Sequence, residues 1–207
     1  MSAGLIITHQ HGELAARPGE MVLVSGESGS GKTLFLNRLA GIESLPEKTS
    51  ITLAGAPLHE DTSLSLRMYF DIYPPLWLGR LTRDELLFGL SDIEEPDIQQ
   101  ALKHWRLNDL PLDTPTERLN RLQHLRLMLA AVQLAEIQLV LLDNPTSSLS
   151  TQEQSEFLSD LQDWSMHSNA IVIIACARHE EWLPTVQHHW HIETAQAWPS
   201  IHGATHE

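Results

Sequence analysis

A stretch near the N-terminus combines glycines, a lysine and a threonine at the spacing of a phosphate-binding loop. Residues 26–33 fit the pattern G-x-x-x-x-G-K-[ST] at every fixed position. In such a loop, successive backbone amides face a polyphosphate, and the following helix adds its positive N-terminal end. The lysine reaches the β- and γ-phosphates, and the threonine hydroxyl binds Mg²⁺. The predicted binding residues are Gly26, Glu27, Ser28, Gly29, Ser30, Gly31, Lys32 and Thr33.

The same residues fit a simpler interpretation, a Gly/Ser-rich turn that carries an incidental lysine. The flanks favour the phosphate loop, because an apolar run precedes it and a helical pattern follows it. A nucleophilic hydrolase that uses Ser28 or Ser30 is set aside, since the chain has no G-x-S-x-G elbow. The segment therefore predicts binding of a nucleoside triphosphate and does not say what the binding is for.

A carboxylate at the end of another apolar run can complete this site. Residues 139–142 are Leu, Val, Leu and Leu, and Asp143 follows them. Ligands of open α/β sheets bind at the carboxyl ends of the strands, where an aspartate can hold Mg²⁺ through water. Alone, Asp143 is better interpreted as the end of a strand. Together with the loop, Thr33 and Asp143 are the predicted Mg²⁺ ligands.

Strand and helix patterns that alternate along the chain must position these residues. Four apolar runs predict strands of a parallel sheet, at residues 21–24, 51–53, 138–142 and 170–176. Helical spacing predicts helices at residues 33–40, 119–134 and 151–164. The first should stop at Gly41, and the last should begin with a capping box of Ser150 and Glu153. This alternation is typical of an α/β fold.

Two further regions have weaker patterns. Residues 81–115 read as helical and are rich in Leu, Asp and Glu, which predicts a helical insertion between strands. The tail is rich in His and Trp, with one predicted strand near residues 188–194. No internal repeat or low-complexity linker is present.

Composition narrows the classes of protein. The chain has 207 residues and a formal net charge of −14, which argues against nucleic acid as a main partner. One cysteine, Cys176, allows no disulfide within the chain and fits a reducing compartment. We expect no signal peptide, and no apolar run approaches the roughly 20 residues that span a bilayer. A role at a membrane is therefore expected to come through a partner.

These motifs together resemble the ATP-binding cassette (ABC) family, the nucleotide-binding subunits of ABC transporters. The resemblance covers most of the chain: residues 17–26 look like the family's lead-in to the loop, 33–41 like its first helix and 81–90 like the start of its helical subdomain. Residues 141–150 are close to the family's L-L-D-E-P-T-S-A-L-D. The resemblance implies a P-loop α/β core with a mostly parallel sheet and a small helical subdomain. It implies one domain over residues 1–207, with the helical insertion at approximately 81–125.

Several positions depart from the family's catalytic pattern. The family's catalytic Glu aligns with Asn144, and an amide cannot accept a proton from water. The signature L-S-G-G-Q aligns with residues 119–123, in which the Ser and both glycines are replaced, while Gln123 and, beyond it, Arg126 are kept. We expect Arg121 and Leu122 to put side chains where a partner's γ-phosphate has to approach.

Other family positions also differ. The switch His aligns with Ala177, and His179 lies close by in sequence without being an expected substitute. The Mg²⁺-sensing Gln aligns loosely with Asp71, and the Asp of the D-loop with Ser150. No aromatic residue is identified that would stack on adenine, so the choice of ATP over GTP rests on the resemblance.

The resemblance and the departures lead to a hypothesis of MgATP binding with weak or absent hydrolysis. The family holds ATP between the loop of one subunit and the signature of another, so this chain would damage both composite sites of a heterodimer. The first functional hypothesis is a nucleotide-binding subunit of an ABC-type complex that grips a membrane permease at the cytoplasmic face, as a homodimer or with another ABC ATPase. The alternative is a non-hydrolysing pseudo-ATPase with a structural or regulatory role; a P-loop kinase is disfavoured.

Two clusters of unusual residues remain. The histidines at 188, 189, 191, 202 and 206 invite a metal site, but Trp190 and Ile192 alternate with them as in a half-buried strand, which we favour. Tyr73, Leu76 and Trp77 are interpreted either as a groove for the permease or as an edge of the helical core, and both interpretations stay open.

Overall fold

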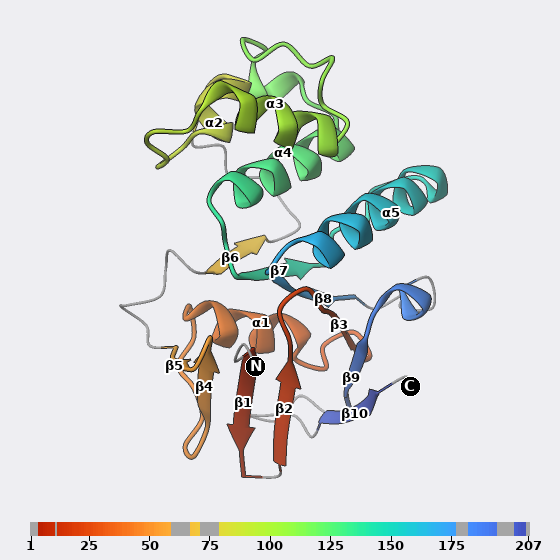
Figure 1. Cartoon of the computed structure of the whole chain (residues 1–207). Coiled ribbons are helices and arrows are strands. Elements are labelled where there is room, and N and C mark those ends of the chain that lie inside the picture. Colours follow the sequence, from red (N-terminus) through yellow and green to blue (C-terminus); the bar gives the residue numbers. More distant parts are fainter. Residues whose placement is uncertain are drawn as a thin grey trace. The chain divides into compact units, whose positions relative to one another are not determined.

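The computed structural model describes residues 4–10, 12–58, 67–70, 79–176 and 182–193, and the backbone of 201–205. The chain divides into two compact units (Figure 1). The first comprises residues 1–72, 138–145 and 165–207, and the second comprises residues 73–137 and 146–164. In the described part of the chain, no helix combines the length and apolar character needed to cross a membrane.

The first unit contains a six-stranded sheet in the order β10-β9-β3-β8-β7-β6. The strands β6, β7, β8, β3 and β9 run parallel, and β10 joins the edge antiparallel to β9. Every residue of the three central strands is buried, as expected when both faces of a parallel sheet are covered. The bounds are β3 Met21–Ser25, β6 Arg67–Phe70, β7 Leu139–Asp143, β8 Ile171–Ala175, β9 His188–Ile192 and β10 Ile201–Thr205.

A second, antiparallel sheet in the same unit has the order β2-β1-β4-β5. Its bounds are β1 Leu5–His9, β2 Gly12–Ala16, β4 Ser50–Leu53 and β5 Ala56–Pro57. The apolar run at 51–53 was predicted as a strand of the parallel sheet, and this assignment is wrong. It lies in β4, whose alternating burial is typical of an antiparallel strand with one covered face.

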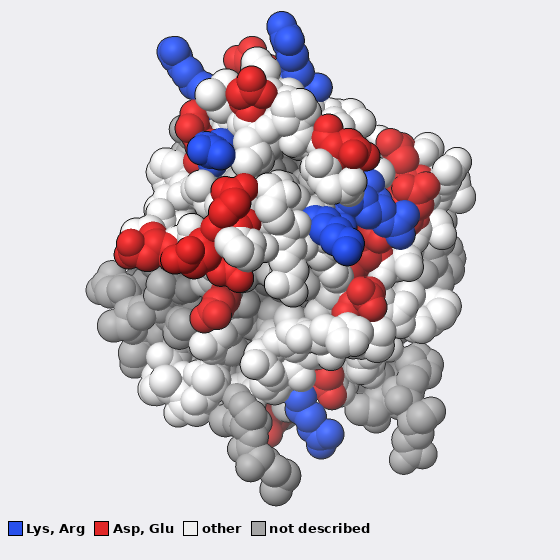
Figure 2. Space-filling view, turned by 45° about the horizontal axis from the view of Figure 1, so that its top comes forward, with Lys and Arg blue, Asp and Glu red and all other residues white. Residues whose placement is uncertain are grey.

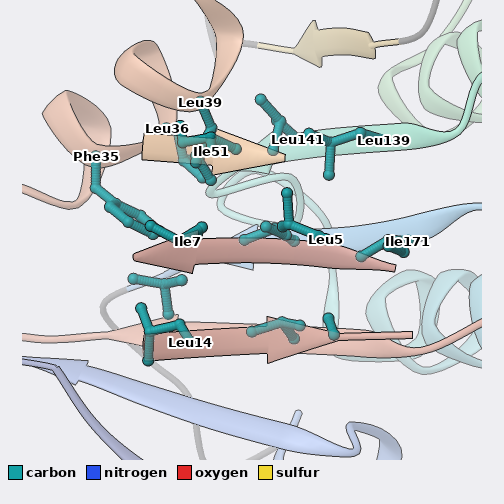
Figure 3. Packing of buried hydrophobic residues seen from close by; sticks show 14 of the residues in the cluster. Leu5, Ile7, Leu14, Phe35, Leu36, Leu39, Ile51, Leu139, Leu141 and Ile171 are labelled. Atoms are coloured by element: carbon teal, nitrogen blue, oxygen red, sulfur yellow. The ribbon is translucent and has the colours of Figure 1, made fainter. Parts of the chain in front are cut away.

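The hydrophobic core of this unit lies among the two sheets and helix α1 (Lys32–Ala40), as Figure 3 shows. Leu5 and Ile7 come from the antiparallel sheet, Phe35 and Leu36 from α1, and Leu141 from the parallel sheet. Helix α1 ends at Gly41, as predicted, with Gly41 in the left-handed region at φ 75°. This packing fixes α1 against the parallel sheet, whose strand β3 precedes the helix in sequence.

The second unit is helical. It contains α2 (Thr82–Leu86), α3 (Glu95–His104), the 3₁₀ turn Thr116–Arg118, α4 (Arg121–Leu134) and most of α5 (Thr151–His167). Residues 81–115 therefore hold two helices separated by loops. The predicted capping box of α5 is confirmed, because Ser150 N donates to Glu153 Oε2 at 2.9 Å and Glu153 N donates to Ser150 Oγ at 3.4 Å. The Ser150 hydroxyl also donates to Glu153 Oε2 at 2.7 Å, and this bond, followed by the bond from Ser150 N, holds the pKa of Glu153 below its ordinary value.

Acidic and basic side chains lie near one another on the surface (Figure 2). Figure 2 shows acidic side chains in several groups on one face, interrupted by basic ones. Some of the basic side chains are engaged in ion pairs, as between Arg106 Nη2 and Asp160 Oδ1 at 2.8 Å. Although the chain has a net negative charge, some of its acidic side chains are neutralised locally by neighbouring arginines.

Candidate functional site

The phosphate-loop residues connect the carboxyl end of β3 to the first turn of α1. β3 ends at Ser25 and α1 begins at Lys32, so the strand, loop and helix follow one another as the motif requires. Gly31, directly before the helix, has φ 103°, which side chains rarely adopt. Gly26 has φ 152°, and a Cβ there would lie 2.5 Å from the carbonyl oxygen of Ile192. Both glycines are therefore required by the backbone.

Lys32 folds back over the start of its own loop. Its Nζ donates to the carbonyl oxygens of Gly26 and Glu27, each at 2.7 Å. Burial lowers the pKa of Lys32 below its ordinary value, and nearby Asp143 and Cys176 partly offset this effect. The cation is thus held at the loop by neutral carbonyl groups, which a phosphate could replace.

The two predicted metal ligands lie in contact across 110 residues of sequence. Thr33 Oγ1 donates to Asp143 Oδ2 at 2.6 Å. Asp143 is the last residue of β7 and is 4% exposed, and Thr33 is in the first turn of α1. The α1 helix packs against β7, which brings the hydroxyl and the carboxylate together. Hydroxyl and carboxylate oxygens are ligands that suit Mg²⁺.

A cavity of about 460 Å³ opens beside this pair. This volume is within the range of small-molecule sites. Its lining comprises Ser28, Gly29, Gly31, Lys32, Thr33, Leu34, Asn37, Asp143 and Asn144. Of the predicted loop residues, Gly26, Glu27 and Ser30 do not line it.

Two residues at the cavity were not identified from the sequence. Leu34 and Asn37 line it from α1, and Asn37 lies one helical turn beyond Thr33. That i, i+4 spacing from a predicted ligand is the signal that could have found Asn37. Two buried oxygens, Asn37 Oδ1 and Ser30 Oγ in the loop, have no hydrogen-bond partner among the described residues. Asn37 lines the cavity, so a polar ligand there would suit its oxygen, because an unpaired buried acceptor is costly.

Asn144 lies where the chain turns away from β7. Its φ of 49° is left-handed, a region that Asn tolerates better than most residues, and its N–H donates to Ala175 O at 2.7 Å. The side chain lines the cavity next to Asp143. The structure therefore places an amide group beside the predicted Mg²⁺ ligand, and its assignment to the catalytic Glu position stays a prediction.

The segment aligned with the family signature forms the start of α4, in the helical unit. Asn120 caps this helix: its Oδ1 accepts from Gln123 N at 2.8 Å, and Gln123 Oε1 accepts from Asn120 N at 3.1 Å. Leu122 is buried at 7% exposure, so the expectation that it presents its side chain to a partner is wrong. Burial of an apolar side chain is favourable, which explains this direction. Arg121 is half-buried.

The residues Gln123 and Arg126, which match the family pattern, are both engaged inside the helical unit. Arg126 is buried and donates to Asp160 Oδ2 from Nε at 3.1 Å and from Nη2 at 2.7 Å. Burial, followed by the positive charge of Arg121, lowers the pKa of neighbouring His124 to about 4. The start of α4 is thus fixed by capping, burial and an ion pair.

Several predicted positions lie outside the described residues: Asp71, Tyr73, Leu76, Trp77, Ala177, His179 and His206. The side chain of His202 is also outside them. His189 and His191 do lie on one face of β9, and both contact Ser25 Oγ. Among the residues that the structure describes, no group of three His, Cys, Asp or Glu side chains could hold a metal ion.

The fold matches solved structures of known ATP-binding cassettes. The match to cbiO1 from Clostridium perfringens, part of the ABC transporter complex cbiONQ, covers 99% of this chain and 89% of cbiO1. Its TM-score is 0.78 and the sequence identity is 17%. The chain covers 92% of MJ1267, an ATP-binding cassette of an ABC transporter, with a TM-score of 0.80 and 14% identity. At these identities the likeness establishes the α/β fold alone, and it confirms the predicted fold class.

Sequence comparisons identify relatives with higher identity. The chain is 36% identical over 143 residues to the cytochrome c biogenesis ATP-binding export protein CcmA of Bordetella bronchiseptica, covering 66% of this chain and 63% of that protein. It is 29% identical over 173 residues to the energy-coupling factor transporter ATP-binding protein EcfA1 of Lactiplantibacillus plantarum, covering 79% and 60%. The chain thus spans less than two thirds of the length of these relatives.

A family model described as ABC transporter matches residues 10–147, a segment that contains the loop, the start of α4 and Asp143. This match covers more than half of the chain. The phosphate loop and the Thr33–Asp143 pair lie within the matched segment. The chain therefore belongs to the ABC transporter family.

Proposed function

We propose that this chain binds MgATP and serves as the ATP-binding subunit of an ABC-type membrane transport complex, with weak or absent ATP hydrolysis. The observation that carries the binding is the contact between Thr33 and Asp143 beside Lys32 in one cavity. Family membership supplies ATP as the nucleotide and a transport complex as the setting. On this proposal, residues 1–207 form one nucleotide-binding domain, with a helical insertion at approximately residues 81–125.

Each site residue has a role in this proposal. The backbone of residues 26–31 holds the phosphates, and Lys32 exchanges its two carbonyl partners for phosphate oxygens. Thr33 and Asp143 hold Mg²⁺, which neutralises charge on the phosphates when it is bound. Asn144 lines the same cavity, and its side-chain amide can hydrogen-bond but cannot accept a proton from water.

Isothermal titration with MgATP tests the binding. Replacing Lys32 with Ala removes a buried charge-assisted contact of about 3 kcal/mol, so we expect an affinity loss of about 100-fold. Lys103→Ala is the matched control, because Lys103 is exposed on α3, outside the cavity. Folded wild-type protein without measurable MgATP affinity would refute the proposal.

Slow hydrolysis is supported by two features in different units. Asn144 carries an amide where the family has a carboxylate, and the start of α4 carries Arg121 in place of a glycine. A turnover assay on the assembled complex tests this part, since a rate of about 1–10 s⁻¹ is ordinary for an enzyme and would contradict it. We expect Asn144→Glu alone to leave turnover low, because the signature segment stays altered.

The partner is proposed to be a membrane permease, together with a second copy of this chain or another ABC ATPase. A peripheral position on the inner face of the cell membrane would follow from the permease contact. Purification of the untagged complex from its native membrane, followed by identification of its subunits, tests these partners. Nucleotide that stays bound and unhydrolysed in that complex would favour the alternative, a pseudo-ATPase with a structural or regulatory role.

A further inference from the structure

A buried hydroxyl lies directly before the phosphate loop and contacts two imidazole rings. Ser25, the last residue of β3, is fully buried. Its Oγ is 2.7 Å from Nε2 of His189 and 2.8 Å from Nδ1 of His191. A buried hydroxyl is costly unless it is hydrogen-bonded, so these two rings stabilise Ser25 in this position.

The pairing of β3 with β9 produces this cluster. The strands run parallel, with Ser25 opposite His191 and Leu23 opposite His189. Alternation along β9 places both histidines on one face, while Trp190 and Ile192 belong to the hydrophobic core. Trp190 meets Phe35 of α1 edge to face, with ring centroids 6.2 Å apart. Core packing on one face therefore fixes β9 so that its other face presents two imidazoles to Ser25.

The hydrogen-bond count gives the two rings different roles. A serine hydroxyl has one hydrogen to donate, and a neutral imidazole has one donor and one acceptor nitrogen. When Ser25 donates to one ring, the other ring must donate to the Ser25 oxygen. The arrangement therefore depends on a nitrogen at the Nε2 position of residue 189 and at the Nδ1 position of residue 191.

The next residue along the chain connects this cluster to the phosphate-binding lysine. Gly26 follows Ser25, and its Cα lies so close to β9 that a Cβ would be 2.5 Å from Ile192 O. The carbonyl oxygen of Gly26 accepts a hydrogen bond from Lys32 Nζ at 2.7 Å. A shift of Ser25 would therefore move the carbonyl that holds Lys32.

We infer that Ser25, His189 and His191 are positioning residues that hold the start of the phosphate loop and, through the Gly26 carbonyl, orient Lys32 for nucleotide. This inference rests on the proposed ATP binding at the loop. It assigns the β9 histidines to the nucleotide site, although neither lines the cavity. Loss of the cluster should weaken nucleotide affinity without removing any residue that touches the ligand.

Variants that keep or remove one hydrogen-bonding atom separate positioning from strand packing. Asn places a polar atom near the Nδ1 position of His, and Gln places one near Nε2. We expect His191→Asn and His189→Gln to bind MgATP within about threefold of wild type. His191→Leu and His189→Leu should each lose about 10-fold in affinity, the effect of one buried hydrogen bond. Ser25→Ala removes both bonds and should lose more than about 10-fold. His188→Gln is the control, because His188 contacts Glu20 rather than Ser25.

Two measurements decide the matter: calorimetric MgATP affinity, and hydrogen exchange of residues 25–33 in the nucleotide-free protein. Faster exchange of this segment in Ser25→Ala and the Leu variants, but not in His191→Asn or His189→Gln, supports positioning even if wild type binds no ATP. Absence of wild-type ATP binding would count against the proposed function alone. Equal exchange and equal affinity in the polar and apolar variants would overturn the inference.

Discussion

The phosphate loop and the start of α4 both match family motifs, but the matching residues do different work in the two regions. In the loop, Gly31, Lys32 and Thr33 line the cavity that would receive nucleotide. In α4, the side-chain oxygen of the matching Gln123 accepts a hydrogen bond from Asn120 N, and the matching Arg126 donates to Asp160. The loop has kept ligand-facing residues, whereas α4 has kept residues that fold its own unit.

A residue that is identical to the family motif therefore does not by itself indicate contact with a ligand. The replaced signature positions are the ones expected to approach a ligand, and one of the replacements, Leu122, is buried. A helix can therefore lose its recognition role while its cap and its ion pair persist.

The largest effect is expected from Arg126→Met. This change removes Arg126 from the buried carboxylate of Asp160, which then keeps its ion pair with the half-exposed Arg106. Breaking one side of a buried ion pair costs about 3–5 kcal/mol, and we expect the free energy of unfolding to fall by about that amount. Urea titration measures it, with exposed Arg118→Met as the control. A change below about 1 kcal/mol would show that Arg126 is not kept for folding.

The loop should respond to Gly26→Ala more strongly than to Gly29→Ala. A Cβ on Gly26 meets Ile192 O at 2.5 Å, whereas one on Gly29 meets nothing within 4 Å. Both positions have positive φ, so Gly29→Ala should cost about 1 kcal/mol from strain and Gly26→Ala about 2–3 kcal/mol. Thermal unfolding and MgATP titration of both variants measure the contrast. Equal losses would indicate that β9 does not press on the loop.

Acid should destabilise the helical unit through His124. Its pKa is about 4 in the folded chain and 6.5 ordinarily, so the unfolded state binds more protons between these pH values. Stability from this group is complete above pH 6.5 and is lost as the pH falls toward 4. We expect a loss of about 2 kcal/mol between pH 7 and pH 5. His124→Leu should reduce the pH dependence by that amount in unfolding titrations; an unchanged dependence would contradict the assignment.

The smallest effect is expected at the cap of α4. Asn120→Ala removes the side-chain acceptor for Gln123 N, which costs about 1 kcal/mol. Asn120→Ser restores the family residue and keeps a capping oxygen, so its stability should stay within about 0.5 kcal/mol of wild type. Chemical denaturation compares the two variants. Equal losses for Ala and Ser would mean that the cap contributes little here.

Much of the fold follows from local sequence. The central strands and α1 were predicted because buried parallel strands read as apolar runs, and the end of α1 because Gly41 takes a left-handed φ. The β1–β2 hairpin was not predicted, since its short strands carry weak patterns. The sheet of β4 was assigned wrongly because an apolar run does not say which strand it pairs with.

The candidate site was predictable from the sequence where its residues are contiguous, and where a general rule relates residues that are far apart in the chain. Residues 26–33 form a contiguous motif, and Asp143 follows from the rule that ligands lie at the carboxyl ends of strands. The contact of Ser25 with His189 and His191 was not predictable, because it depends on the pairing of strands more than 160 residues apart. The burial of Leu122 likewise depends on tertiary packing.

The short bond between Thr33 and Asp143 has a consequence for which oxygen can meet the cation. The hydroxyl gives its single hydrogen to the carboxylate at 2.6 Å, so the lone pairs of Thr33 Oγ1 stay available to a cation. The carboxylate of Asp143 has further acceptor sites and can hold the same cation through water. The two side chains therefore already share their hydrogen in the direction that magnesium binding requires.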